Sequence, residues 1–205
     1  MPESGTEILA TRVAFLELKD ERRLIQEGYE LLDEKRMLLA SEIMRQLRRL
    51  AALREERERL DAEARRALEA AAAVHGFDEL TVMPKRDLGA ALLRTDAQVF
   101  LGLQLLEAAI EEPQRAGAVH PQLPTPEARA CEAAFHRLLL AEAPIAACVG
   151  NLRRLVREYV RTERRARALE NVMLPEIDGS LKFIEEQLDA VDQEEAIRVR
   201  NAART

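Results

Sequence analysis

Aromatic residues are scarce in this chain of 205 residues, which contains no Trp and only 3% aromatic residues in total. Charged residues, by contrast, make up 33% of it. Because a domain of this size normally anchors its core on aromatic side chains, we do not expect a thick single core. A composition rich in Ala, Leu, Glu and Arg with helical periodicity is typical of long helices or a coiled coil.

Long apolar runs are also missing. No stretch of about 18 apolar residues is apparent, so we expect no direct membrane insertion. The opening residues 1–5 lack a basic region followed by an apolar one, so they do not resemble a signal peptide. The net charge of −6 argues against nucleic acid as a partner.

Catalytic motifs are lacking as well. Neither G-x-x-x-x-G-K-[ST] nor G-x-G-x-x-G occurs, so we do not expect the chain to bind ATP. His75, His120 and His136 have no metal-ligand spacing with each other or with the cysteines. Cys131 and Cys148 fall in one expected helix, roughly 25 Å apart, which predicts free thiols. We therefore expect no catalytic residue, no cofactor and no metal, and a protein that is not an enzyme.

Proline and glycine are concentrated in the middle of the chain. Four of the eight glycines and five of the eight prolines lie between Gly76 and Pro126. Before this region a helix of roughly 70 residues is expected, opened by a capping box of Ser4 and Glu7. After it, Thr125 is the expected N-cap of a second long helix that runs toward residue 200.

This punctuation predicts a mainly all-α fold, a long antiparallel two-helix coiled coil with a short compact middle segment. The expected parts are an N-terminal shaft helix (1–75), a middle foot segment (76–125) and a C-terminal shaft helix (126–205). In the middle, Leu80–Met83 and Gln98–Leu103 are candidate strands, and residues 103–112 could equally be helical. The sequence leaves open whether this segment holds a small β-hairpin or short helices.

Apolar residues recur at helical spacing in both long helices. In the first they are Leu9, Val13, Leu16, Leu24, Leu31, Leu38, Leu39, Ile43, Leu47, Leu50, Leu53 and Leu60. In the second they are Ile145, Val149, Leu152, Val156, Tyr159, Leu169, Met173, Ile177, Leu181, Ile184, Leu188 and Val191. Residues 169–181 follow steps of four, a longer period that would relax or reverse a left-handed supercoil. Pro144 and Pro175 should bend the helix locally.

Two segments carry a resemblance to a known family. Residues 164–170 read R-R-A-R-A-L-E, five residues before Pro175, and resemble the R-R-V-N-A-L-E signature of the D subunit of the V-type and A-type rotary ATPases. Near the N-terminus, Thr11-Arg12 and the run G-x-x-L-L-x-x-K-R at 28–36 match the family's opening pattern. Residues 181–185 (L-K-F-I-E) resemble the family's I-K-Y-I-E.

The chain departs from the family pattern in several places. Ala10 replaces the usual proline, Arg167 the signature asparagine, and Gln193 an arginine. Asp20, Glu21 and Glu27 stand where the family is typically basic.

The resemblance implies the central rotor shaft of a V-type ATPase or ATP synthase, cytoplasmic and peripheral to the membrane. The implied partners are the A and B subunits of the catalytic ring, the F subunit and the connector subunit of the membrane ring. The implied rotor–stator or shaft contacts are Thr11, Arg12, Gly28, Lys35, Arg36, Arg164, Arg165, Leu169, Glu170, Pro175 and Ile184.

Other interpretations stay open at this point. The arginines at 153, 154, 157, 161, 164, 165 and 167 form either a solvated helix face or a docking surface. A helical-hairpin scaffold fits the same periodicity. A stalk protein of a flagellar or type III export ATPase also fits, although a plain hairpin needs only a short turn in the middle.

Overall fold

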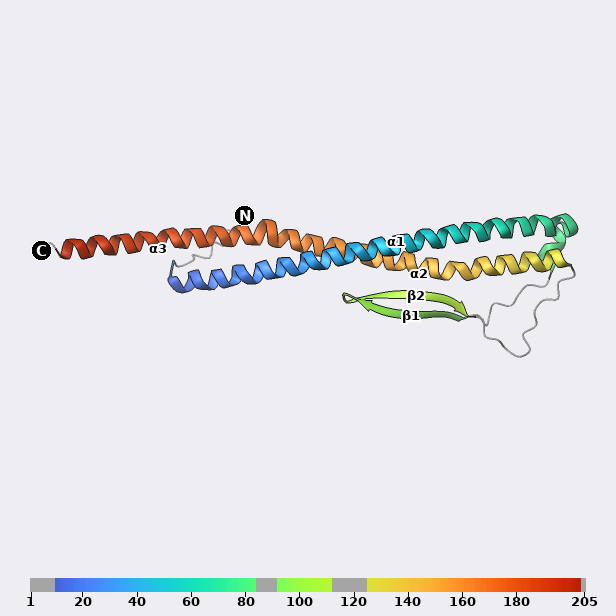
Figure 1. Cartoon of the computed structure of the whole chain (residues 1–205), viewed down its shortest axis with the longest axis horizontal. Coiled ribbons are helices and arrows are strands. Elements are labelled where there is room, and N and C mark those ends of the chain that lie inside the picture. The colour runs from blue at the N-terminus through green and yellow to red at the C-terminus, as the bar shows by residue number, and fades with distance from the viewer. Residues whose placement is uncertain (1–9, 84–91, 112–124, 204–205) are drawn as a thin grey trace. The chain divides into compact units, whose positions relative to one another are not determined.

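The computed structural model describes residues 10–83, 92–111 and 125–203. Its elements are α1 (Arg12–Val82), β1 (Leu92–Phe100), β2 (Leu103–Glu111), α2 (Pro126–Ala168), a π-helical turn η1 (Leu169–Met173) and α3 (Leu174–Ala202). Figure 1 shows them along the chain. The mainly helical fold class with a small β-hairpin is confirmed. The capping box of Ser4 and Glu7 and the apolar Leu9 lie outside the described residues.

The chain forms two compact units, and the boundaries fall within the long helices. Unit 1 comprises Met1–Leu38 and Tyr159–Thr205, and unit 2 comprises Leu39–Glu158. In unit 1, the first part of α1 pairs antiparallel with the end of α2, η1 and α3. In unit 2, the rest of α1 pairs antiparallel with α2.

The apolar row of α1 that faces the partner helix is not the one expected from the sequence, but the row whose residues each lie one position later. Leu24, Leu31 and Leu38 are 64%, 67% and 43% exposed, so their assignment to the apolar stripe was wrong. The less exposed row in unit 1 is Leu18, Ile25 and Leu32. The same heptad continues into unit 2 through the fully buried Leu39 and then Gln46.

In the apolar stripe of α2, η1 and α3, the buried residue also differs from the expected one at several positions. Val156, Met173 and Val191 are 46%, 39% and 59% exposed, although they were expected in the stripe. Leu155, which the stripe omitted, is fully buried in unit 2. Two polar side chains, Asn151 in unit 2 and Thr162 in unit 1, are each only 2% exposed. An apolar-only criterion could not find those two positions.

Toward one end of the helix pair in unit 2, the buried side chains become small. Its buried residues there are Ala64, Ala71, Ala128 and Ala134. Small side chains allow two helix backbones to approach closely, as heptads of larger residues do not. Ion pairs span the same region, from Arg57 to Glu142 at 2.8 Å and from Arg137 to Glu63 at 3.3 Å.

The first helix does not end at Gly76. That residue has φ 71° and ψ 161°, which kinks the helix, and α1 then continues to Val82. The expected strand at Leu80–Met83 was therefore wrong. Beside the kink, His75 Nε2 lies 2.7 Å from Thr125 Oγ1. Thr125 Oγ1 also accepts a hydrogen bond from the Ala128 amide at 3.3 Å, so the predicted N-cap of α2 is confirmed.

The middle segment contains a two-stranded antiparallel hairpin. Phe100 pairs with Leu103, so Leu101 and Gly102 form a two-residue turn. Their φ values of 49° and 83° suit a type I′ turn, which matches the twist of the flanking strands. Residues 103–111 form a strand, so the helical alternative for 103–112 was wrong.

The expectation that no long apolar stretch exists needs one qualification. The helical run Pro126–Ala202 contains an 18-residue window of mean hydropathy 1.3, which is long and apolar enough to cross a membrane by length and composition. Helices that pack inside soluble proteins pass the same criterion, so this window alone does not identify a membrane segment.

Candidate functional site

The π-helical turn η1 lies at the centre of the predicted signature, between α2 and α3. Along this run in unit 1, the inward positions Thr162 and Leu169 are seven apart, whereas Leu169 and Ile177 are eight apart. The next inward residue, Ile184, is again seven further and fully buried. The stripe therefore contains one extra residue between Leu169 and Ile177. A turn closed by an i→i+5 hydrogen bond accommodates this residue and keeps the later residues on the same face. The Leu174 amide donates this bond to the Leu169 carbonyl.

Pro175 follows directly, in the first turn of α3. A proline inside a helix clashes with the carbonyl four residues earlier and cannot donate to it. A wider turn just before the proline relieves this crowding. The steps of four expected at residues 169–181 thus correspond to a local π turn, which is one way for a helix to follow a longer period.

Gly28 of α1 faces Leu169. A Cβ atom placed on Gly28 would lie 3.7 Å from Leu169 Cδ1, which is ordinary van der Waals contact. Next to it, the Glu170 carboxylate raises the pKa of the Tyr29 hydroxyl, because a nearby negative charge disfavours the phenolate. Three residues of the predicted set, Gly28, Leu169 and Glu170, are therefore brought together in unit 1.

Ion pairs join the two ends of the chain in unit 1. Arg12 Nη2 lies 3.1 Å from an Asp192 oxygen, and Arg22 Nε lies 2.5 Å from Asp178 Oδ1. Thr11 caps α1, since its Oγ1 accepts a hydrogen bond from the Ala14 amide at 3.1 Å. Because these pairs are exposed, they specify the antiparallel register more than they stabilise the fold. Asp178 and Asp192 were missed because carboxylates are common on every face of these helices.

The remaining predicted residues are not part of η1, although Arg36 is near enough to the Tyr29 hydroxyl to lower its pKa, against the larger effect of Glu170. Arg36 pairs with Asp33 on the same helix, and Lys35 is half-buried. Arg164 and Arg165 are exposed, as is Arg161 one turn earlier. In the described residues these three arginines have no ion pair, whereas Arg167 pairs with Glu163 at 2.6 Å. We call Arg161, Arg164 and Arg165 the arginine face.

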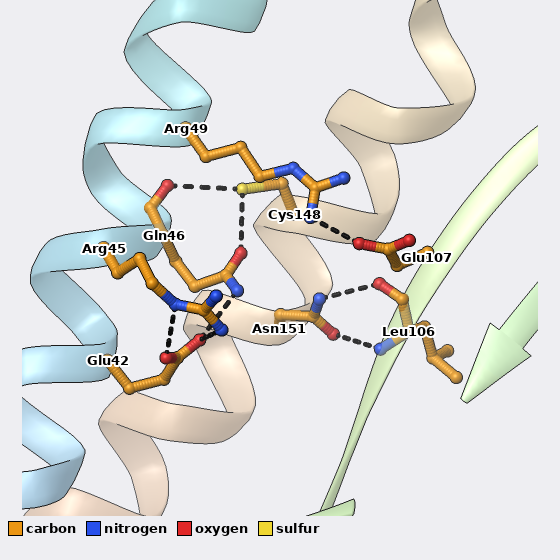
Figure 2. Close-up of polar contacts among 8 residues, drawn as sticks. All are labelled: Glu42, Arg45, Gln46, Arg49, Leu106, Glu107, Cys148 and Asn151. Atoms are coloured by element: carbon orange, nitrogen blue, oxygen red, sulfur yellow. Dashed lines mark hydrogen bonds and ion pairs between the residues drawn. The ribbon is translucent and has the colours of Figure 1, made fainter. Parts of the chain in front are cut away.

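A buried polar layer in unit 2 was not predicted (Figure 2). Glu42 and Gln46 are 5% and 4% exposed. Glu42 accepts two hydrogen bonds from Arg45, at 2.7 and 2.8 Å, and one from Gln46 at 2.8 Å. Cys148 is 2% exposed. Its Sγ atom lies 3.4 Å from the backbone carbonyl oxygen of Gln46 and 3.4 Å from the side-chain Oε1 of the same residue. Burial raises the pKa of the Cys148 thiol, although Arg49 opposes this.

The same layer fixes the hairpin to the helices of unit 2. Asn151 Nδ2 donates to the Leu106 carbonyl at 2.7 Å, and the Leu106 amide donates to Asn151 Oδ1 at 2.8 Å. One side chain thus pairs with β2 as a neighbouring strand would (Figure 2). Arg49 adds an ion pair to Glu107 at 2.7 Å. A polar residue at an inward helix position was the only sequence signal for this layer.

These features are contact surfaces within each unit. Among the described residues, no group of three or more His, Cys, Asp or Glu side chains could hold a metal ion. Both cysteines are free, Cys131 half-buried and Cys148 buried.

Comparison with known proteins gives consistent matches. The family model described as the D subunit of ATP synthase matches residues 14–204. The D subunit of a V-type ATP synthase from Thermus thermophilus is 30% identical over 200 residues, covering 95% of this chain and 87% of that protein. One from Anaeromyxobacter dehalogenans is 31% identical, covering 93% of this chain and 92% of its own. The D subunit of an A-type ATP synthase from Thermococcus kodakarensis is 29% identical over 93% of this chain and 90% of its own.

The contact between Gly28 and Leu169 yields a test of how closely the helices approach. Gly28→Ala should raise the free energy of unfolding by roughly 0.5–1 kcal/mol, because the methyl group fits and alanine favours the helix. Gly28→Leu should lower it, because the larger side chain meets Leu169. Urea unfolding of the two variants measures this. If both variants were equally stabilised, the close approach in unit 1 would be wrong.

The buried Glu42 predicts a specific sensitivity to acid. Burial is the largest single influence and raises its pKa, but hydrogen bonds from Arg45 and Gln46 together outweigh it, so the net pKa is lowered. The carboxylate therefore stabilises the fold above its unfolded pKa of about 4.3, and this contribution is lost as pH falls through the folded pKa.

In Glu42→Gln, the free energy of unfolding should fall less between pH 6 and pH 3 than it does in the unaltered protein. Glu30→Gln, at an exposed position in unit 1, is the matched control and should leave the pH dependence nearly unchanged. Urea unfolding at each pH gives the comparison. A Glu42→Gln profile parallel to the parent would contradict the assignment.

Proposed function

Because this chain belongs to the family of ATP synthase D subunits, we propose that it is the central rotor shaft of a V-type ATPase or ATP synthase. The observation that carries the proposal is the match over residues 14–204 together with antiparallel pairing of the chain's two ends in unit 1. A paired shaft can be gripped by a surrounding ring, whereas separate ends could not transmit torque.

We propose that the ring consists of the A and B subunits and that the shaft itself carries no catalytic group. A shaft that is asymmetric in charge contacts each catalytic site differently, so the sites cannot all adopt one conformation. Turning the shaft redistributes these contacts, and ATP hydrolysis or synthesis is thereby coupled to ion movement through the membrane ring. This requires only stiffness, shape and surface charge from the chain.

The remaining partners follow from the same proposal. The middle foot segment (76–125) would lie near the F subunit and the connector subunit of the membrane ring. The parts at 1–75 and 126–205 would act as the two shaft helices. The protein would then be cytoplasmic and attached to the membrane only through the complex. The hairpin, held by Asn151, supplies an ordered surface within the foot.

The direct experiment is reconstitution of the complex from its subunits with and without this chain. We expect the chain to co-purify with the A and B subunits and to be required for ATP hydrolysis coupled to ion movement. Co-purification with neither of them, or full coupling in its absence, would reject the proposed function. No observation on the chain favours the scaffold or the export-ATPase stalk over this function.

The arginine face yields a more specific prediction. Arg161→Ala/Arg164→Ala/Arg165→Ala should lower coupled ATP turnover several-fold at low salt, because acidic groups of the ring lose exposed cationic partners. The difference from the parent should shrink as salt rises. Lys182→Ala/Arg198→Ala/Arg200→Ala removes three exposed cations of α3 in the same unit and is the matched control. Unchanged turnover in the triple variant would contradict this role.

A further inference from the structure

The exposed side of α1 in unit 1 carries a second regular apolar row. Leu24, Leu31 and Leu38 lie seven residues apart and are 64%, 67% and 43% exposed. They are not the residues that face the partner helix in unit 1, because that row is Leu18, Ile25 and Leu32. Leucine at every seventh position is the spacing by which one helix packs against another.

Carboxylates occupy the alternate positions of this row. Asp20, Glu27 and Glu34 are also seven residues apart, and together with the leucines they complete the steps of four and three of a coiled-coil seam. The Asp20 and Glu27 side chains are 71% and 63% exposed. Arg23 lies on their flank, 3.3 Å from Asp20 and 4.0 Å from Glu27, and one cation cannot neutralise both.

We call Asp20, Leu24, Glu27, Leu31, Glu34 and Leu38 the acidic leucine seam. It spans about 27 Å of helix, which is long enough for two to three heptads of a partner. The alternation stops at Leu38, because the next positions in the same register are Ser41 and Arg45. The seam therefore ends at the same residue as the part of α1 that belongs to unit 1.

We propose that the acidic leucine seam is the docking site for a helix of a neighbouring protein in the complex, one in which apolar residues alternate with Lys or Arg at the same spacing. Burial of the leucines supplies affinity, and the carboxylates select a basic partner and reject an acidic one. Two copies of this chain are poor partners seam to seam, since the carboxylates would oppose carboxylates in a parallel pair and leucines in an antiparallel pair, with no cation facing them in either case. Only the identity of the neighbour, as a component of the rotary complex, rests on the proposed function.

The first test uses the full chain and two synthetic four-heptad peptides, one with Leu and Lys at the seam positions and one with Leu and Glu. Fluorescence anisotropy should detect binding of the Leu–Lys peptide, weakening as salt rises, and none of the Leu–Glu peptide. Leu24→Ala/Leu31→Ala should weaken binding at least about tenfold, because two apolar side chains are lost from the contact. Val191→Ala/Ile197→Ala, which removes exposed apolar groups of α3, should not weaken it.

Charge is tested in the same assay. Asp20→Asn/Glu27→Gln/Glu34→Gln should weaken binding about tenfold at low salt, whereas Glu185→Gln/Asp189→Asn/Glu195→Gln, of equal net charge, should not. Circular dichroism confirms that each variant stays helical. Equal binding of both peptides, no binding of either, or equal effects of seam and control variants would overturn the proposal.

The second test identifies the occupant. Leu31 is replaced by the photo-crosslinking residue p-benzoylphenylalanine, and the chain is reconstituted with the other components of the complex. A crosslink to a basic apolar helix of one of them supports the proposal. A crosslink to a second copy or to a segment without that pattern, or no crosslink in an assembled complex, overturns it. If the complex does not assemble, the proposed function fails, while the peptide experiment still decides whether the seam binds a basic helix.

Discussion

The pairing of chain ends in unit 1 depends on keeping two apolar stripes in phase over many turns. The stripe of α1 follows a regular heptad from Leu18 to Leu32, whereas the opposite stripe has one residue too many between Leu169 and Ile177. Without the π turn, every inward residue of α3 would rotate by about 100°, and Ile184 would leave the contact. The turn, the proline that follows it and the glycine opposite it are therefore one arrangement, which keeps α3 aligned with α1.

In unit 2, buried polar groups fix the axial register of the two helices. A stripe of leucines and alanines can slide along its partner at small cost, but a buried polar layer cannot, because every displaced partner leaves an unsatisfied group. Glu42, Gln46 and Cys148 fix the helices in one register, and Asn151 fixes the hairpin to the same layer (Figure 2). The position of the hairpin on the helices thus depends on a few hydrogen bonds together with the buried side chain of Leu105 in β2.

Much of this could be predicted from the sequence, and the failures have physical causes. Helix lengths, the Thr125 cap and the signature at 164–175 depend on local spacing, which a sequence displays directly. The inward row of α1 was misassigned because leucines occur in two adjacent rows, and only the partner decides which one is buried. The hairpin turn was obscured because Leu101 adopts a positive φ that usually signals Gly or Asn. The polar layer was missed because its one sequence signal, a polar residue at an inward position, could be recognised only with the correct inward row of α1.

The most direct measurement of the central claim is a comparison of single-residue deletions in unit 1. Deletion of Asn171 together with Pro175→Ala removes the extra residue and the proline that the π turn accommodates, so the stripe should continue as a regular α-helix. Deletion of Glu30 from α1, where no extra residue exists, should shift the remaining stripe out of phase. The account predicts that urea unfolding finds the first variant about as stable as the parent and the second strongly destabilised. Equal destabilisation by the two deletions would contradict it.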